Sequence, residues 1–329
     1  MSKDEYLITD APLKALTVFA MPMILGSFFQ QIYNMADSII VGQFVGSSAL
    51  AAVGACAALT NVFICVALGA GVGAGVLVSR YFGARDYGKM KTIVSTSLIS
   101  FLVLSILLGI FGFCFSHSMM SLLQTPADIL DEAVLYLRVY FVGFPFLFMY
   151  NILSTMFTSI GESRIPLVLL IFSSVLNIFL DILFIVPFHM GVAGAAWATI
   201  LSQFLSAVLS LVVGLKNFSI LHLHREDFTD LKDTAVLHLK TGFPMGFQMS
   251  VMCIGQLAMQ AVVNSLGTAA VAGYTAASKA DQLSVLVNNA MMTAISNYVA
   301  QNFGAGRWDR IRQGVDNIDE ILAVSDGIM

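Results

Sequence analysis

Two acidic residues stand alone within long apolar segments of the chain. Asp37 is the only charged residue between Ala15 and Ser79, and Asp181 is the only acidic residue between Arg164 and Lys216. A charge placed inside hydrocarbon is costly, so an ionisable residue there predicts a site that binds or moves something. The simplest chemistry for a carboxylate in such a place is the binding and release of a cation.

Uncharged oxygen and amide groups lie close to these acids in the sequence. Asn177 is four residues before Asp181, so both side chains lie on one face of a helix. Thr199 offers a hydroxyl group in the next apolar segment. At 1.5 Å per residue, Asp37 and Thr199 lie about 12 Å, and Asp181 about 9 Å, from the ends of their segments at one membrane surface. Three segments are therefore expected to bring these groups to a similar depth.

Two chemical interpretations of this set stay open. Two carboxylates in a low-dielectric pocket repel each other and lose their hydration, so at least one is expected to hold a proton near neutral pH. Alternatively, the two acids, the Asn177 carbonyl and the Thr199 hydroxyl form a set of hard oxygen ligands for Na⁺. The structural alternative is that Asn or Thr neighbours satisfy each acid, which then only orients the helices.

The elements that must position these groups are predicted to be membrane-spanning helices. The chain is 58% hydrophobic and 11% charged, whereas soluble domains carry about 25% charge. Its apolar runs are long enough to cross about 30 Å of hydrocarbon as helices. The fold class expected is an all-α integral membrane protein with about eight spans, at 14–45, 49–78, 92–116, 133–160, 165–187, 191–214, 238–264 and 269–300.

The distribution of Lys and Arg predicts the orientation of these spans. With the N-terminus in the cytoplasm, nearly all of the basic residues fall in cytoplasmic segments, and the outer loops hold none. Arg138, near the outer end of the fourth span, and Lys279 are the exceptions. The expected location is the cytoplasmic (inner) membrane, with several spans and a cytoplasmic N-terminus.

The chain contains an internal repeat. "VGSSALAAVGACAALTNVF" aligns with "LGTAAVAGYTAASKADQLS", and in the same register "RYFGARDYGKM" aligns with "QNFGAGRWDRI". Six spans precede the second copy, so both copies enter the membrane from the same side, as in parallel transporter repeats. The predicted domains are an N-terminal six-helix lobe (1–215), a cytoplasmic connector (216–237) and a partial C-terminal lobe (238–329). The pattern of the first copy calls for four more spans, so we expect a truncated or frameshifted product of a longer gene.

The second copy has polar residues of its own. Gln256 and Gln260 lie in the seventh span, and Lys279 and Asp281 lie in the eighth. A role in a substrate cavity and a structural pairing between helices are both open for them.

Two further features concern the helices themselves. Pro22 and Pro244, at similar places in the two copies, predict hinges or kinks, and the glycines of "GAGVGAG" predict close helix packing and not phosphate binding.

The ordered segments resemble the multidrug and toxic compound extrusion (MATE) family, in particular its DinF-like prokaryotic branch. The resemblance rests on "PMILGSFFQQIYNMADSIIVGQFVG", "GAGVGAGVLVSRYFGARD", "FTSIGESRIPLVLLIFSSVLNIFLDILFI", "MGVAGAAWATILSQ" and "SLGTAAVAGYTAASKADQL". It implies twelve helices in two six-helix lobes and export of amphipathic cationic drugs in exchange for H⁺ or Na⁺. It also implies a coupling-cation site at Asp37, Asn177, Asp181 and Thr199.

The expected function is therefore a cation-coupled antiporter that works by alternating access, and not an enzyme. The expected partners are small organic cations and membrane lipid, with no nucleic acid, no obligate protein partner, no cofactor and no metal beyond Na⁺ at the four-residue site. A flippase for lipid-linked precursors is one alternative, and it ranks lower because Lys279 is the one basic residue available for a phosphate in the cavity. A non-transporting membrane remnant is the other, because four spans are missing from the pattern.

Overall fold

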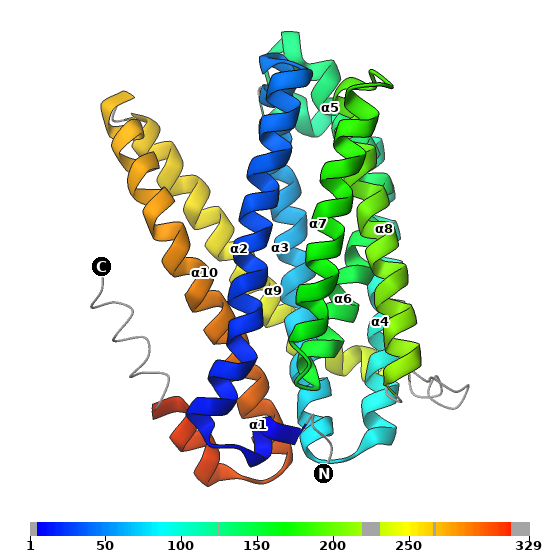
Figure 1. The fold of residues 1–329 in the computed structure, drawn as a ribbon, viewed down its shortest axis with the longest axis vertical. Coiled ribbons are helices and arrows are strands. Elements are labelled where there is room, and N and C mark those ends of the chain that lie inside the picture. Colours follow the sequence, from blue (N-terminus) through cyan, green and yellow to red (C-terminus); the bar gives the residue numbers. More distant parts are fainter. Residues whose placement is uncertain (1–4, 124, 219–230, 266–267, 317–329) are drawn as a thin grey trace.

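The computed structural model describes residues 5–123, 125–218, 231–265 and 268–316, apart from some side chains in α3, α9 and α10. The described elements are helices, which confirms the all-α fold class: α1 Tyr6–Thr9, α2 Pro12–Phe44, α3 Ser47–Gly83, α4 Tyr87–Leu122, α5 Ala127–Val142, α6 Phe144–Ser159, α7 Arg164–Ile185, α8 Gly191–Asn217, α9 Leu231–Ser265 and α10 Thr268–Gly304. Most of them run side by side along the long axis of the molecule (Figure 1). Helices suit a bilayer because each satisfies its own backbone hydrogen bonds.

Several of these helices are long and apolar enough to cross a membrane. Within the described residues five pass this test by themselves, in α2, α3, α4, α7 and α8, and the pair α5 and α6 adds a sixth. The chain is therefore a multi-pass membrane protein. α9 and α10 have 35 and 37 residues and match the seventh and eighth predicted spans in position. α9 begins at Leu231, so helical structure extends into the predicted connector; the domain boundaries stay a prediction.

The fourth predicted span, 133–160, is not one straight helix as the apolar run suggested. It consists of α5 and α6, which meet at Gly143 with a bend of 51°. Pro145 has no backbone N–H to continue the helical ladder, and its ring restricts the residue before it. Gly143 also lies where Ile200 of α8 approaches closely, so a side chain at this position would clash. The apolar run predicted this span but not its bend, because hydropathy does not register local backbone chemistry.

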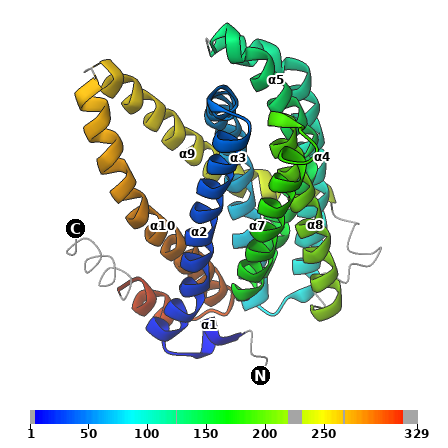
Figure 2. The same cartoon turned by 45° about the horizontal axis from the view of Figure 1, so that its top comes forward.

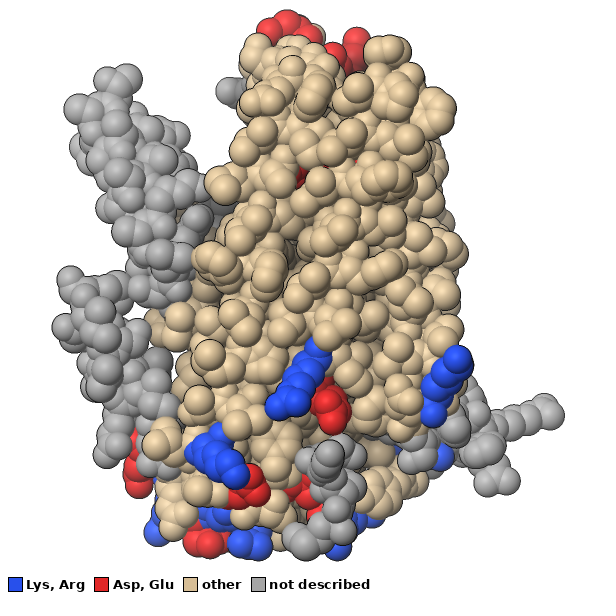
Figure 3. Space-filling view, viewed as in Figure 1, with Lys and Arg blue, Asp and Glu red and all other residues tan. Residues whose placement is uncertain are grey.

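The two ends of the molecule differ in charge. We call the end that carries Arg80, Arg85, Lys89 and Arg164 the basic end. Lys and Arg gather there among some acids, whereas acids alone are visible at the opposite end (Figure 3). α4 starts at the basic end, where Asp86 caps it by accepting a hydrogen bond from the backbone N–H of Lys89. This separation is the one that the positive-inside pattern predicts.

The first six spans form one bundle with a continuous apolar core. α2 packs against α7, α7 against α8, and α5 and α6 pack against α4 and α8. Aromatic rings fill the centre of the bundle, where Phe63, Phe141 and Phe144 meet edge to face. The bundle therefore fixes the relative positions of α2, α5, α7 and α8, the helices that carry the polar residues described below.

The two copies of the repeat meet at the basic end. Gly83 of α3 lies against the backbone carbonyl of Gln301, and Gly304 of α10 lies against the backbone carbonyl of Arg80. These four residues are equivalent in pairs in the aligned segments "RYFG" and "QNFG". Such reciprocal contacts are those of an approximate two-fold axis, and they support the duplication predicted from the sequence.

The glycine-rich segment of α3 forms a second close contact between the copies. Gly69 lies against Gly246, and Gly73 lies against Gly242, so tightly that a side chain at either position would overlap the α9 backbone. The prediction that these glycines permit close helix packing is confirmed. Towards the end opposite the basic end, α9 and α10 diverge from α2 and α3, as both views show (Figures 1 and 2).

Candidate functional site

The structure brings the predicted cation residues together inside the bundle. Asp37 projects from α2, Asn177 and Asp181 from α7, and Thr199 from α8. Asp181 is 0% exposed and Asn177 is 1% exposed. Their carboxyl and amide groups are therefore shielded from both water and lipid. We refer to these four residues as the oxygen cluster.

Asn177 links the two helices that carry most of the cluster. With its amide oriented to satisfy both of its atoms, its nitrogen donates to Oδ2 of Asp181 at 2.8 Å. Its oxygen accepts from the backbone N–H of Thr199 at 3.1 Å. The Thr199 hydroxyl donates to the carbonyl of Ala195 one turn earlier. Asn177 thus holds one oxygen of Asp181 in place and leaves the other available.

The carboxyl groups of Asp37 and Asp181 lie close enough to interact electrostatically. In each of them Oδ1 is buried and accepts no hydrogen bond from a donor of the described residues. Among these residues, no lysine or arginine forms an ion pair with either acid. Two ionised carboxylates this close repel each other, and a proton or a cation between them would relieve the repulsion.

Three tyrosines that the sequence analysis missed complete the surroundings of the acids. Tyr33, one turn before Asp37 on α2, lies close to the Thr199 side chain. Tyr136 and Tyr140 of α5 stack with their ring centroids 6.0 Å apart, and both lie close to Tyr33. Their rings exclude water from the acids, and their hydroxyl groups add polar atoms to the cluster.

Gln203 of α8 is a further residue missed from the sequence. It lies one turn after Thr199, and together they line a cavity of about 10 Å³ with Tyr140 and Gly143. Oε1 of Gln203 is buried and has no hydrogen-bond partner among the described residues. Each of four helices thus contributes two polar residues four positions apart, and this spacing is the signal that could have found Tyr33 and Gln203.

The other predicted site residues lie apart from this cluster. Gln256 is exposed on α9. Gln260, Lys279 and Asp281 belong to α9 and α10, but their side chains lie outside the described part of the structure. Pro22 and Pro244 are inside the unbroken helices α2 and α9. Their roles in a cavity or as hinges stay predictions.

These features define a class of protein: a multi-pass helical membrane protein with a duplicated helix pair and a buried, unneutralised acid pair. The MatE family model matches residues 22–183 and 244–318. The chain belongs to the MatE family, as the resemblance predicted.

Relatives with assigned names are similar over most of the chain. The probable multidrug resistance protein YpnP of Bacillus subtilis is 34% identical over 303 residues, which are 91% of this chain and 67% of that protein. The multidrug export protein MepA of Staphylococcus aureus (strain MSSA476) is 27% identical over 312 residues, 93% of this chain and 68% of that protein. The chain therefore spans about two thirds of the length of these relatives.

Solved structures show the same fold. One is the outward-facing conformation of a multidrug resistance MATE family transporter, which has a TM-score of 0.91 and 26% identity, and covers 100% of this chain and 74% of its own. Another is a MOP superfamily transporter from Pyrococcus furiosus, with a TM-score of 0.90, 26% identity, and coverage of 98% and 73%.

Proposed function

We propose that the bundle binds a coupling cation at Asp37, Asn177, Asp181 and Thr199, and that the whole protein uses this cation to export amphipathic organic cations. The observation that carries the proposal is the pair of neighbouring carboxyl groups, each with a buried Oδ1 that no donor of the described residues satisfies. A purely structural acid is expected to have its oxygens satisfied, because unpaired buried acceptors cost stability. The unpaired oxygens therefore support reversible binding of a ligand at this site.

The closeness of the two carboxyl groups favours a proton as the coupling cation. One proton shared by Asp37 and Asp181 removes half of the charge and converts the repulsion into a short O–H···O contact. Na⁺ binding requires several oxygen ligands around the ion, and it remains the second candidate because Thr199 and Tyr33 supply further oxygens next to the acids.

The residues around the acids have separable roles in this mechanism. Asn177 fixes Oδ2 of Asp181, so the cation exchanges at Oδ1. Tyr136 and Tyr140 keep water away from the two acids. Charges interact strongly in such a low-dielectric region, so adding or removing one cation changes the electrostatic free energy of the acid pair considerably. When the cation leaves, the acid pair carries an extra negative charge. Repulsion then favours a different packing of α2 against α7, and this coupling links the cation to a conformational change.

Transport is proposed for the whole protein, because this chain covers about two thirds of the relatives that are named for multidrug export. In that protein the two bundles would rock about a central cavity, so that substrate leaves as the cation enters. We place the basic end and the N-terminus in the cytoplasm of a cell whose inner membrane holds the protein. A lipid-linked phosphate substrate is less well supported, because the cluster is acidic and would repel it.

The test uses proteoliposomes that hold the whole protein and an imposed cation gradient, with ethidium as the fluorescent substrate. The double variant Asp37→Asn and Asp181→Asn is expected to abolish gradient-driven transport. Asp128→Asn, an exposed acid at the end opposite the basic end, is the matched control and should transport as the wild type does. Gradient-driven transport at wild-type rate by the double variant would overturn the proposal.

Cation binding itself can be measured on this chain alone in detergent. The pH change of a weakly buffered sample on mixing with Na⁺ reports whether Na⁺ displaces a proton from the acid pair. A proton-only site is expected to give no Na⁺-dependent release. Saturable release that disappears in Asp181→Asn would assign Na⁺ in place of H⁺.

A further inference from the structure

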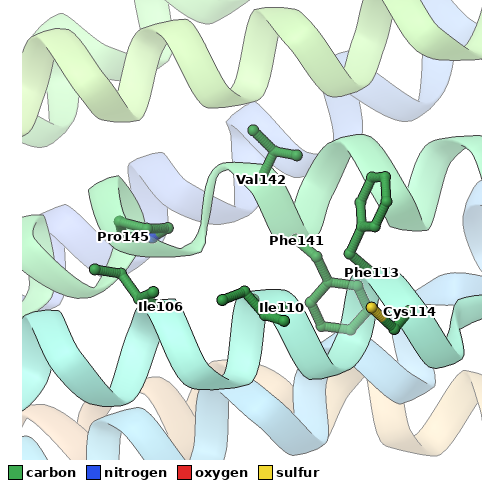
Figure 4. Close-up of a pocket in the computed structure, with 8 residues that line it drawn as sticks. Ile106, Ile110, Phe113, Cys114, Phe141, Val142 and Pro145 are labelled. Carbon is green, nitrogen blue, oxygen red and sulfur yellow. The ribbon is translucent and has the colours of Figure 1, made fainter.

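An apolar groove lies on the outside of the bundle, away from the oxygen cluster. Its volume is about 360 Å³, and it runs between α4 and the break where α5 meets α6. Ile106, Ile110 and Phe113 form one wall, and Val142 and Pro145 form the other (Figure 4). Gly109 and the buried ring of Phe141 form its floor.

The bend between α5 and α6 creates this groove. A straight helix would continue against α4, whereas the 51° bend turns α6 away from the line of α5. Gly109 and Gly112 let the backbone and ring of Phe141 pack directly onto α4, so the floor is close to the helix axis. The wall residues remain open, with Ile106 43%, Ile110 59% and Val142 48% exposed.

Arg138 lies next to Phe113, at one end of the groove. The guanidinium of Arg138 lies 5.7 Å from the ring centre of Phe113, and its Nε donates to the Ser116 hydroxyl at 3.1 Å. Arg138 is exposed, and within the described residues no acid forms an ion pair with it. A guanidinium that is exposed and has no acid paired with it among the described residues suits a bidentate contact with phosphate.

The polar and apolar groups along α4 follow the same order as the headgroup and the acyl chains of a lipid in a membrane. α4 has 36 residues, which is about 54 Å at 1.5 Å per residue and exceeds a hydrocarbon core of about 30 Å at both ends. Ser116 is six residues before the helix end at Leu122, so it lies at the level of the headgroups. From Phe113 to Ile106 the groove descends about 10 Å into the hydrocarbon region.

We propose that this groove is a binding site for one anionic phospholipid of the leaflet at the end opposite the basic end. The phosphate contacts the terminal nitrogens of Arg138, and one acyl chain lies along Phe113, Ile110 and Ile106 as far as Pro145. Ser116 holds the guanidinium in place for this contact. A net negative headgroup is preferred because it brings no positive charge of its own close to the Arg138 guanidinium.

Native mass spectrometry of the purified chain in detergent tests the site, with dioleoyl phosphatidylglycerol as the probe and dioleoyl phosphatidylcholine as the neutral comparison. The wild type is expected to retain one phosphatidylglycerol about tenfold more strongly than phosphatidylcholine, because both lipids carry the phosphate but only phosphatidylcholine brings a choline cation that competes with Arg138 for it. Arg138→Gln should remove this preference, and Arg138→Lys should restore part of it. Arg164→Gln, an exposed arginine at the basic end, should change nothing.

A second pair of variants tests the acyl groove without touching the charge. Ile106→Trp fills the groove and should weaken retention of both lipids, whereas Leu107→Trp, at a position 61% exposed on α4 that does not line the groove, should not. Circular dichroism of each variant confirms that it is folded. Equal retention of the two lipids by the wild type would overturn the proposal. Equal loss in Ile106→Trp and Leu107→Trp would overturn it too, even if Arg138→Gln fails to fold.

Discussion

Two regions with buried polar side chains differ in how far the protein satisfies them, although at the basic end too one atom, Oε1 of Gln301, has no partner among the described residues. At the basic end Ser79 binds both the carbonyl of Ser159 and the side chain of Asn297, and Arg310 donates to Asn302 and to two backbone carbonyls. In the oxygen cluster, Oδ1 of Asp37 and Oδ1 of Asp181 have no partner among the described residues. The groups at the basic end hold the two copies of the repeat together, whereas the cluster keeps acceptors available for a ligand.

The buried polar groups of the basic end therefore serve stability, whereas those of the oxygen cluster serve ligand binding. A satisfied buried network rigidifies its surroundings, and an unsatisfied acceptor costs free energy that only a ligand recovers. Substitutions at the basic end should therefore destabilise the protein without changing cation binding. Substitutions in the cluster should do the reverse.

The largest effect is expected where the two copies touch through glycine. In Gly83→Ala the new methyl group would overlap the Gln301 carbonyl, which is backbone and cannot rotate away. Forcing α3 from α10 should lower the unfolding free energy by about 3 kcal/mol. The midpoint of thermal unfolding in detergent, followed by circular dichroism, measures this change.

The control is Gly54→Ala on the same helix, where an added methyl group meets no atom within 4 Å. It should raise stability slightly, because Ala favours a helix by about 1 kcal/mol over Gly. If Gly83→Ala and Gly54→Ala destabilise the protein equally, α3 is sensitive to the loss of any glycine. The close contact between the two copies would then not explain the effect of Gly83→Ala.

The next largest effect is expected at Arg310. Its guanidinium bonds to Oδ1 of Asn302 and to the carbonyls of Leu7 and Asp10, so it ties α1 to the second copy. Arg310→Gln leaves these buried acceptors without donors and should cost about 2 kcal/mol. Limited proteolysis should then cut within residues 5–12 faster. Arg312→Gln, an exposed neighbour, should leave both stability and cleavage unchanged, and similar cleavage of all three proteins would contradict the prediction.

A smaller effect of the opposite sign is expected in the oxygen cluster. Asp181→Asn keeps the size of the side chain, removes a buried charge and lets the new amide donate to Asp37. The unfolding free energy should rise by about 1 kcal/mol while cation binding is lost, as is common when a functional group is removed. Thermal unfolding of this chain and gradient-driven transport by the whole protein check the two halves. A fall in stability would mean that Asp181 serves mainly to orient its helix.

The sequence predicted the helices well and their interruptions poorly. Long apolar runs determined the spans because a membrane permits few alternatives. The bend between α5 and α6 was missed because residues 133–160 are continuously apolar. The sequence signal for the bend is local: a glycine lies two residues before Pro145. A hydropathy average over many residues does not detect such a pair.

The candidate site could be predicted only as far as charge reveals it. Asp37 and Asp181 stood out because each is the only acid in its segment. Tyr136 and Tyr140 did not, because aromatic residues in a span usually serve packing. Which of the aromatic rings approach the acids depends on how α5 packs against α8, and this follows from contacts distant in the sequence. The role of the cluster in cation coupling stays a prediction.

The smallest effect is expected at Tyr6. Removal of one hydrogen bond there tests the comparison between the basic end and the oxygen cluster. The Tyr6 hydroxyl donates to the carbonyl of Gly161 at 2.8 Å and joins α1 to the turn between α6 and α7. Tyr6→Phe keeps the ring and removes this bond, which at a half-buried position should cost about 0.5 kcal/mol. Tyr87→Phe is the control, since that ring is 46% exposed and packs on Phe82 without its hydroxyl. If the basic end serves only to join the two copies, Tyr6→Phe should lower the unfolding midpoint slightly more than Tyr87→Phe and leave gradient-driven transport by the whole protein unchanged. A changed transport rate in Tyr6→Phe would instead show that α1 and the cluster are coupled, and the separation between the two regions would not hold.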